Sequence, residues 1–291
     1  MSKKSFFLWL VVVIVFGVHL DYLNQRIVRM EGESKAMRGI SSELFAMEYK
    51  MAAFQSILSH EAFSKGRKIH VFKSTQSTKN VDDALISNAP GQADRNWGAG
   101  PKIGAGYDGD GNIYRTLIRF NELKKAIPER TQIMAATVYL KQVDNGNKDD
   151  RALRETFNLM EVKKNWGEGN KIGLRASQGE VTWNAAAQSI LNWRSPGCSA
   201  RGADVNTDTM LATTGANVNE AGDGWVAFSF TPPGISRLEQ LIYQQKESDY
   251  GFLIQLPDEA KKKNTFVSFH SSNDPTVFYR PYIEIIYIDD L

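Results

Sequence analysis

The stretch from residue 111 to residue 120, GNIYRTLIRF, constrains the fold of this chain more than any other. Its side chains alternate with period two, with Ile113, Arg115, Leu117 and Arg119 on one parity and Tyr114, Thr116, Ile118 and Phe120 on the other. Period-two patterning of β-branched and aromatic residues predicts a β-strand. Turn-forming residues precede the stretch at 108–112, and we expect a strand near the centre of an antiparallel β domain.

Short alternating segments, separated by glycine-rich turns, continue from residue 69 almost to the end of the chain. They predict strands at residues 69–73, 83–86, 102–105, 114–120, 133–143, 158–162, 225–230, 251–255, 265–270 and 282–287. Residues 235–245 carry apolar side chains at helical spacing and predict one short helix. About ten strands over this length favour an all-β sandwich of two sheets that spans residues 67–291.

The first residues predict a membrane anchor. Lys3 and Lys4 precede an apolar run at residues 6–20, which is short for a transmembrane span of about 20 residues but extends a little further. No small-x-small cleavage site follows the run. We therefore expect an uncleaved signal anchor over residues 1–22 and a domain outside the cytoplasm, at the cell surface or in the periplasm. A cleaved signal peptide is the alternative.

Residues 23–66 contain no proline and predict a long helical stalk. The apolar residues of its second half are spaced 4-3-4-3-4, as in a coiled-coil seam; they are Ile40, Leu44, Met47, Met51, Phe54 and Leu58. Two uses of this seam stay open. In the first, the seam joins several chains into a homo-oligomer. In the second, the segment is an amphipathic helix that packs on the chain's own domain or on a partner. Methionine specifies packing poorly, so the pattern does not decide between them.

Composition excludes several classes of function. The net charge is +2, from 35 basic and 33 acidic residues, which argues against a nucleic-acid-binding protein. The single cysteine, Cys198, excludes an intrachain disulfide and any multi-cysteine metal site. The chain has no Gly-x-Ser-x-Gly elbow and no phosphate-binding loop, and its four histidines are scattered. We expect no enzyme; a polysaccharide lyase or hydrolase is the least favoured alternative.

Several stretches together resemble the DNRLRE-type domain, a jelly-roll module similar to the alginate-binding class of carbohydrate-binding modules. In the order of that family they are DALI (83–86), NWG (96–98), RTLIRF (115–120), ATVYL (136–140), WGEG (166–169), VTWN (181–184), WRSPG (193–197), WVAFSF (225–230), YGFLI (250–254) and PYIEI (281–285). Leu85 and Trp97 replace the usual tyrosines, and the gap between Trp166 and Trp183 is longer than usual. The resemblance implies a jelly-roll β-sandwich that binds polysaccharide without catalysis.

The same resemblance leaves a structural calcium ion open, with Glu168, Asp204 or Asp223 as oxygen donors; no other cofactor is expected. The acidic run at 108–112 does not match an EF-hand loop. Counted from Asp108, the sixth and twelfth positions hold Ile113 and Arg119, where glycine and a bidentate acid are needed. We predict a hairpin turn there.

Four residues form the predicted ligand site: Trp97, Trp193, Arg194 and Arg201. Both tryptophans lie in glycine- and proline-rich loops, where an exposed ring can stack on the apolar face of a sugar. The two arginines flank Trp193, and guanidinium groups pair with carboxylates in bidentate fashion. We therefore expect polysaccharide as the partner, with acidic polysaccharide favoured. The alternative is that these residues only cover one end of the sandwich.

Other residues of the shared motifs are expected to be structural. We place Trp166, Trp183 and Trp225 in the core, and expect Arg115 and Arg119 to be ion-pair partners. Together these patterns predict a membrane-anchored, non-catalytic protein whose β-sandwich binds polysaccharide. The runner-up is a structural surface or assembly protein that uses the sandwich as a spacer or adhesive unit.

Overall fold

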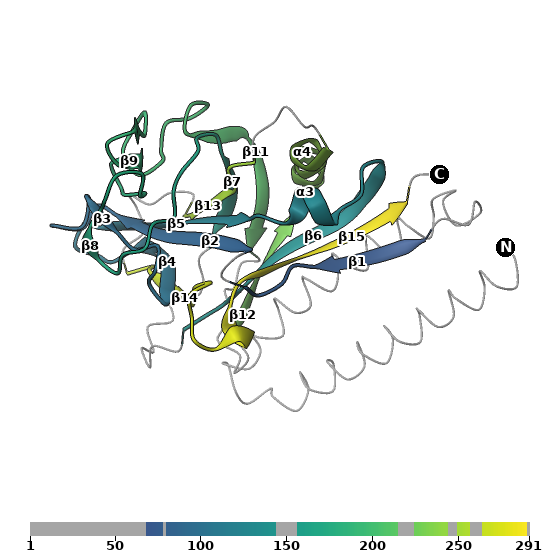
Figure 1. Ribbon diagram of the computed structural model, residues 1–291, viewed down its shortest axis with the longest axis horizontal. Coiled ribbons are helices and arrows are strands. Elements are labelled where there is room, and N and C mark those ends of the chain that lie inside the picture. Colours follow the sequence, from purple (N-terminus) through teal and green to yellow (C-terminus); the bar gives the residue numbers. More distant parts are fainter. Residues whose placement is uncertain are drawn as a thin grey trace, which may run out of the picture.

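The structure, a computed structural model, describes residues 68–77, 80–143, 156–214, 224–243, 249–256 and 264–289. The anchor and the stalk predicted for residues 1–66 lie outside these ranges. Within them, no helix is long and apolar enough to cross a membrane. The described part is mostly β-structure, as the alternating segments predicted (Figure 1).

Eleven strands form one antiparallel sheet in the order β1-β15-β6-β12-β11-β7-β13-β5-β4-β14, with β2 also paired to β5. Their bounds are β1 Ile69–Lys73, β2 Val81–Ser87, β4 Lys102–Tyr107, β5 Ile113–Phe120, β6 Thr131–Lys141, β7 Asn158–Val162, β11 Val205–Thr214, β12 Trp225–Phe230, β13 Phe252–Gln255, β14 Val267–His270 and β15 Tyr282–Asp289. Two short sheets pair β3 (Arg95–Asn96) with β8 (Leu174–Arg175), and β9 (Ala185–Ala187) with β10 (Leu191–Asn192). The described helices are α3 (Leu123–Ala126), α4 (Pro232–Tyr243) and the 3-10 helix η4 (Val277–Tyr279).

The large sheet curls until its two halves face each other, which gives a sandwich-like fold from one continuous sheet instead of two separate ones. The curl closes where β6 ends, because Gln142 bridges to Phe269 of β14 and the Val143 N–H donates to the Ser268 carbonyl at 2.9 Å. The inner core between the halves combines six phenylalanines with a larger number of aliphatic side chains, and the rings of Phe230 and Phe252 meet edge-on at 5.9 Å.

Strand β5 lies at the centre of this arrangement, as its sequence predicted. It pairs with β2 along one side, and with β13 and the end of β4 along the other. Ile118 and Phe120 enter the inner core, whereas Leu117 and Arg115 are buried on the opposite face of the strand. Both parities of β5 therefore lie in the protein interior, which explains why neither parity is purely polar.

Residues 163–204, which we name the cover segment, bury the second face of β5. This segment contains β8, β9 and β10 and has little other regular structure. Its three tryptophans and Val181 join Leu117, Met160 and Leu253 in a second hydrophobic cluster, the outer core. The longer gap between Trp166 and Trp183 that departs from the family pattern lies within this segment.

Helix α4 begins at the two prolines that follow β12. Proline has no N–H to lose in the first turn of a helix, so Pro232 is tolerated there. The Thr231 hydroxyl accepts a hydrogen bond from the Gly234 N–H at 3.1 Å and caps the helix. A Cβ on Gly234 would lie 2.0 Å from the Leu211 carbonyl oxygen, so glycine is required for α4 to pack against β11. Leu238 and Ile242 of α4 then complete the inner core.

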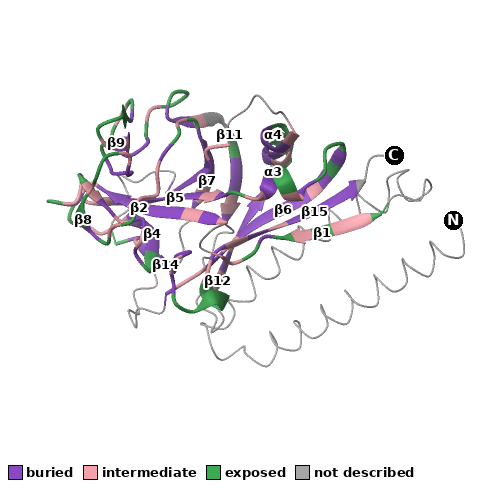
Figure 2. Cartoon of the chain, in the orientation of Figure 1, coloured by how far each residue is buried: buried purple, intermediate pink, exposed green. Residues whose placement is uncertain are grey.

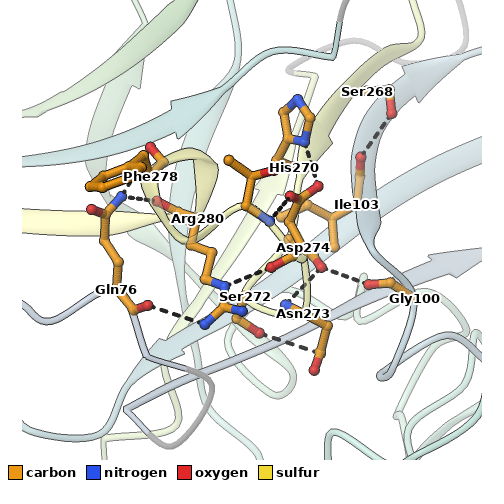
Figure 3. A network of polar contacts seen from close by, with 12 residues as sticks. Gln76, Gly100, Ile103, Ser268, His270, Ser272, Asn273, Asp274, Phe278 and Arg280 are labelled. Atoms are coloured by element: carbon orange, nitrogen blue, oxygen red, sulfur yellow. Dashed lines mark hydrogen bonds and ion pairs between the residues drawn. The ribbon is translucent and has the colours of Figure 1, made fainter.

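A hydrogen-bond network fixes the loop between β14 and β15 (Figure 3). The Gln76 side-chain amide donates to the Arg280 carbonyl at 2.6 Å, and the Arg280 Nε donates to the Asp274 carbonyl at 2.7 Å. The Asp274 carboxylate contacts His270 Nδ1 at 2.6 Å. The Asn273 amide reaches back to the Gly98 carbonyl at 2.8 Å. These contacts hold the end of β1 and the start of β15 in a fixed relation.

Candidate ligand-binding surface

Trp193 lies in the outer core. Its side chain is 5% exposed, and its indole Nε1 donates to the Thr182 carbonyl at 3.0 Å. The ring is therefore part of the packing under the cover segment, and in this structure it does not face solvent. The sequence around Trp193 does not by itself distinguish a buried ring from an exposed one, because both buried and exposed tryptophans occur in glycine- and proline-rich loops.

Arg194 and Arg201 lie near the end of the cover segment, in a loop held by the carboxylate of Asp204. That carboxylate accepts backbone hydrogen bonds from Arg194 at 2.8 Å, from Ser195 at 2.9 Å and from Ala200 at 3.2 Å. It also pairs with Lys164 Nζ at 2.8 Å. Both arginine side chains are exposed, and within the described ranges neither guanidinium is paired with a carboxylate. Asp204 thus fixes the loop backbone and leaves both guanidinium groups facing solvent.

The charge state of Asp204 follows from these contacts. Burial raises the pKa of its carboxyl, but the hydrogen bonds from Lys164 and from the loop N–H groups outweigh burial and leave the pKa below its usual range. The ionised carboxylate is the form that accepts all four hydrogen bonds. The loop is therefore held by a charge that is present at neutral pH.

Glu180 plays a similar part in the middle of the cover segment. It is buried, and its carboxylate accepts the backbone N–H of Ser177 at 2.7 Å and that of Asn170 at 3.1 Å. Lys171 lies 3.9 Å away. Two acids of the segment thus serve backbone N–H groups inside the protein.

The surface of the cover segment is consequently basic. The segment contains six cations and three acids; the cations are Lys163, Lys164, Lys171, Arg175, Arg194 and Arg201, and the acids are Glu168, Glu180 and Asp204. Four of the cations are exposed, at 163, 175, 194 and 201, whereas none of the three acids is. We name these four exposed cations the basic surface. The net charge of +2 for the whole chain does not reveal this surface, because a total does not show where the cations lie.

Trp97 is half-buried and lies beside the pairing of β3 with β8. The backbone of Gly173 lies against its indole, since a Cβ at that glycine would come within 2.6 Å of the ring. The register pairs Arg95 with Arg175, so Trp97 shares this corner of the molecule with one cation of the basic surface. No described contact joins Trp97 to Trp193, Arg194 or Arg201.

The other tryptophans and arginines of the shared motifs have structural contacts. Trp166 and Trp183 are buried in the outer core, as predicted, whereas Trp225 is only half-buried and lies on β12. Arg119 pairs with Asp82, at 2.5 Å, and its guanidinium lies 4.9 Å from the Trp166 ring centroid. Arg115 donates to the Gly197 carbonyl and lies over the Trp183 ring. Arg119 is thus the expected ion-pair partner, and Arg115 ties the cover segment to β5.

The oxygen donors proposed for calcium are placed in separate networks. The run at 108–112 forms a tight turn in which the Asp108 carboxylate accepts its neighbours' N–H groups. The Glu168 carboxylate accepts the Asp83 N–H, Asp204 holds the 194–200 loop, and Asp223 lies outside the described ranges. In the described part of the chain, no three His, Cys, Asp or Glu side chains are grouped so that they could hold a metal ion.

Comparison with known proteins gives no relative for this chain: no family model matches it, and no curated protein matches it. The resemblance to the DNRLRE-type domain therefore rests on the sequence motifs alone.

Proposed function

We propose that this chain is a membrane-anchored, extracytoplasmic protein whose jelly-roll module binds acidic polysaccharide on the basic surface, without catalysis. The observation that carries the proposal is the distribution of charge on the cover segment. Its acids are turned inward onto backbone N–H groups, whereas Arg175, Arg194 and Arg201 face solvent.

This arrangement suits a polymer of uronic acids. Each sugar unit carries one carboxylate, and a guanidinium pairs with a carboxylate through two parallel hydrogen bonds. A half-exposed ring such as that of Trp97 can also cover the apolar face of a sugar unit. The loop that carries Arg194 and Arg201 is already held by the Asp204 carboxylate, so its backbone loses little conformational entropy on binding.

Calorimetry with the full chain in detergent tests this proposal. Alginate and polygalacturonate fragments should release heat on binding at low salt, and a neutral glucan of similar length should release much less. Equal binding of neutral and acidic polymers would show that the basic surface does not determine which polysaccharide is bound. No heat from any polysaccharide, with the fold intact, would contradict the proposal as a whole.

A second candidate is an assembly role, which a separate observation favours. Ile172, Leu174 and Ile190 of the cover segment are each more than half exposed, which is unusual for large aliphatic side chains. Such side chains suit contact with another protein. Sedimentation at increasing concentration distinguishes the two functions, because assembly through the cover segment requires self-association that the Ile190→Ser variant abolishes.

The membrane location rests on the sequence of the first residues. The full chain should stay in the membrane fraction after a carbonate wash, since residues 6–20 form an apolar run behind Lys3 and Lys4. N-terminal sequencing that starts after Leu20 would instead show a released protein.

A further inference from the structure

A third apolar cluster lies outside both cores, on the half-sheet formed by β1, β15, β6 and β12. Ala135 and Ile286 are 3% and 4% exposed, and Ile69 and Met134 pack against them. The neighbouring residues of β6 and β15 enter the inner core, so side-chain alternation turns Ala135 and Ile286 to the opposite face. We name this face of the four strands the outer face.

Strand pairing arranges the outer face in rows. At one end Val71, Ile286 and Ala135 are direct neighbours across β1, β15 and β6, and form an aliphatic row. Val71, on the edge strand, is 61% exposed, whereas Ala135 is buried. Figure 2 shows the same gradient, with β1 half-exposed and β15 beside it buried.

The other end of the outer face is aromatic. Tyr139 and Tyr282 are paired across β6 and β15, and their rings stack at 4.7 Å. Trp225 of β12 meets the Tyr282 ring edge-on at 5.2 Å. These rings are half-buried.

The centre of the outer face is also buried. Thr137 and Ser229 lie between the two ends and point outward, yet they are 5% and 2% exposed. The Ser229 hydroxyl is buried without a hydrogen-bond partner in the described part of the chain. The described helices α3 and α4 contribute Leu123 and Leu238 to the inner core, so neither covers this face (Figure 1).

The chain itself supplies a segment of matching size and character. Residues 37–58 carry the 4-3-4-3-4 apolar seam and would span about 33 Å as a helix. The eleven residues of β6 span about 36 Å. Ten residues, 59–68, connect the seam to β1, which is the edge strand of the outer face.

We propose that residues 37–58 pack as an amphipathic helix on the outer face of their own chain. The seam residues face the sheet: Met47 and Met51 suit the aromatic rings, because a thioether makes favourable contacts at ring edges. The short connection gives the segment an effective concentration of about millimolar, which favours the chain's own face over another copy. This inference is independent of the polysaccharide proposal, because the basic surface lies on the cover segment.

Thiol labelling of the full chain in detergent tests the docking. An Ala135→Cys substitution places a small reporter thiol on the outer face, and native Cys198 reports global unfolding because it is buried in the outer core. A Met51→Glu substitution puts a charge into the seam. The matched control, Ser56→Glu, puts the same charge on the opposite side of the segment.

We expect the reporter thiol to label slowly when Ala135→Cys is the only substitution, and about tenfold or more faster when Met51→Glu is added, because local undocking exposes it. Cys198 should stay protected throughout, and Ser56→Glu should leave both labelling rates unchanged. Rapid labelling of the reporter thiol without any seam substitution would overturn the proposal. So would an unchanged rate in the Met51→Glu variant, or a protection that disappears on dilution, which would assign the cover to a second copy. If Met51→Glu exposes Cys198 as well, the milder Met51→Gln replaces it and the same outcomes apply.

Discussion

The carboxylate of Glu168 accepts a hydrogen bond from the backbone N–H of Asp83 at 2.9 Å. This contact satisfies an N–H of β2, a strand that the described structure pairs only with β5, and it brings two acids together. The Asp83 carboxylate is buried; one oxygen accepts the Ser272 N–H at 2.6 Å, and the other has no hydrogen-bond partner among the described residues. Burial raises the pKa of Asp83 to about 7 and that of Glu168 to about 8.

This pair predicts a fall in stability as the pH rises. The folded state holds these protons up to about pH 7–8, whereas the unfolded chain releases them near pH 4, so the free energy of unfolding decreases between those values. Between pH 5 and pH 8 the Asp83→Asn variant should lose less stability than the native chain, by on the order of 2–4 kcal/mol. Urea unfolding at both pH values measures this, with Asp110→Asn as the exposed control. Identical pH profiles for native and Asp83→Asn chains would refute it.

Because a hydrophobic core lies on each side of β5, truncating a β5 side chain in either core should reduce the free energy of unfolding by a comparable amount. Phe120→Ala opens a cavity in the inner core and should cost about 3–5 kcal/mol, and Leu117→Ala in the outer core about 2–5 kcal/mol. Ile172→Ala, at an exposed site, should change stability by less than about 0.5 kcal/mol. Chemical unfolding followed by tryptophan fluorescence provides the values. A negligible loss at either core position would mean that this side of β5 is not packed.

Asp204 predicts local order in the loop that carries the arginines. Asp204→Ala removes three backbone acceptor contacts and the Lys164 pair, and should cost about 1–3 kcal/mol. Hydrogen exchange should accelerate at the amides of residues 194, 195 and 200. Amides of β5, such as that of Leu117, serve as the internal reference and should keep their protection. Unchanged exchange at all three loop amides would show that Asp204 does not hold the loop.

Cys198 should be inert in the folded protein. Burial raises the pKa of its thiol well above the usual range, and the thiolate is the reactive form. A thiol reagent added at pH 8 should react only when urea unfolds the domain, and the two transitions should coincide. Stoichiometric reaction in native buffer would place Cys198 outside the outer core.

Much of the fold was accessible from local pattern. The strands at 158–162 and 225–230 agree with β7 and β12 to the residue, and the helix expected at 235–245 corresponds to α4. Strand β11 was missed because its sequence, VNTDTMLATT, is polar and alternates weakly; it forms because β7 and β12 pair with it on both sides. Tertiary pairing of this kind leaves no mark on a single sequence.

The sequence predicts the candidate surface only in part. Exposure of Arg194 and Arg201 agrees with the expectation, but the burial of Trp193 depends on how the cover segment folds over β5. The inward orientation of Glu180 and Asp204 also depends on contacts between residues of the folded loops. Sequence counts therefore give the charges of the segment but not which of them reach the surface.

The salt dependence of polyuronate binding tests the central claim most directly. If Arg194 and Arg201 pair with sugar carboxylates, the Arg194→Gln/Arg201→Gln variant should bind alginate fragments about tenfold more weakly at low salt, with a shallower decline as salt is added. Lys125→Gln removes an exposed cation from α3, outside the cover segment, and should match the native chain. Native affinity and native salt dependence in the double variant, measured by calorimetry, would contradict the account.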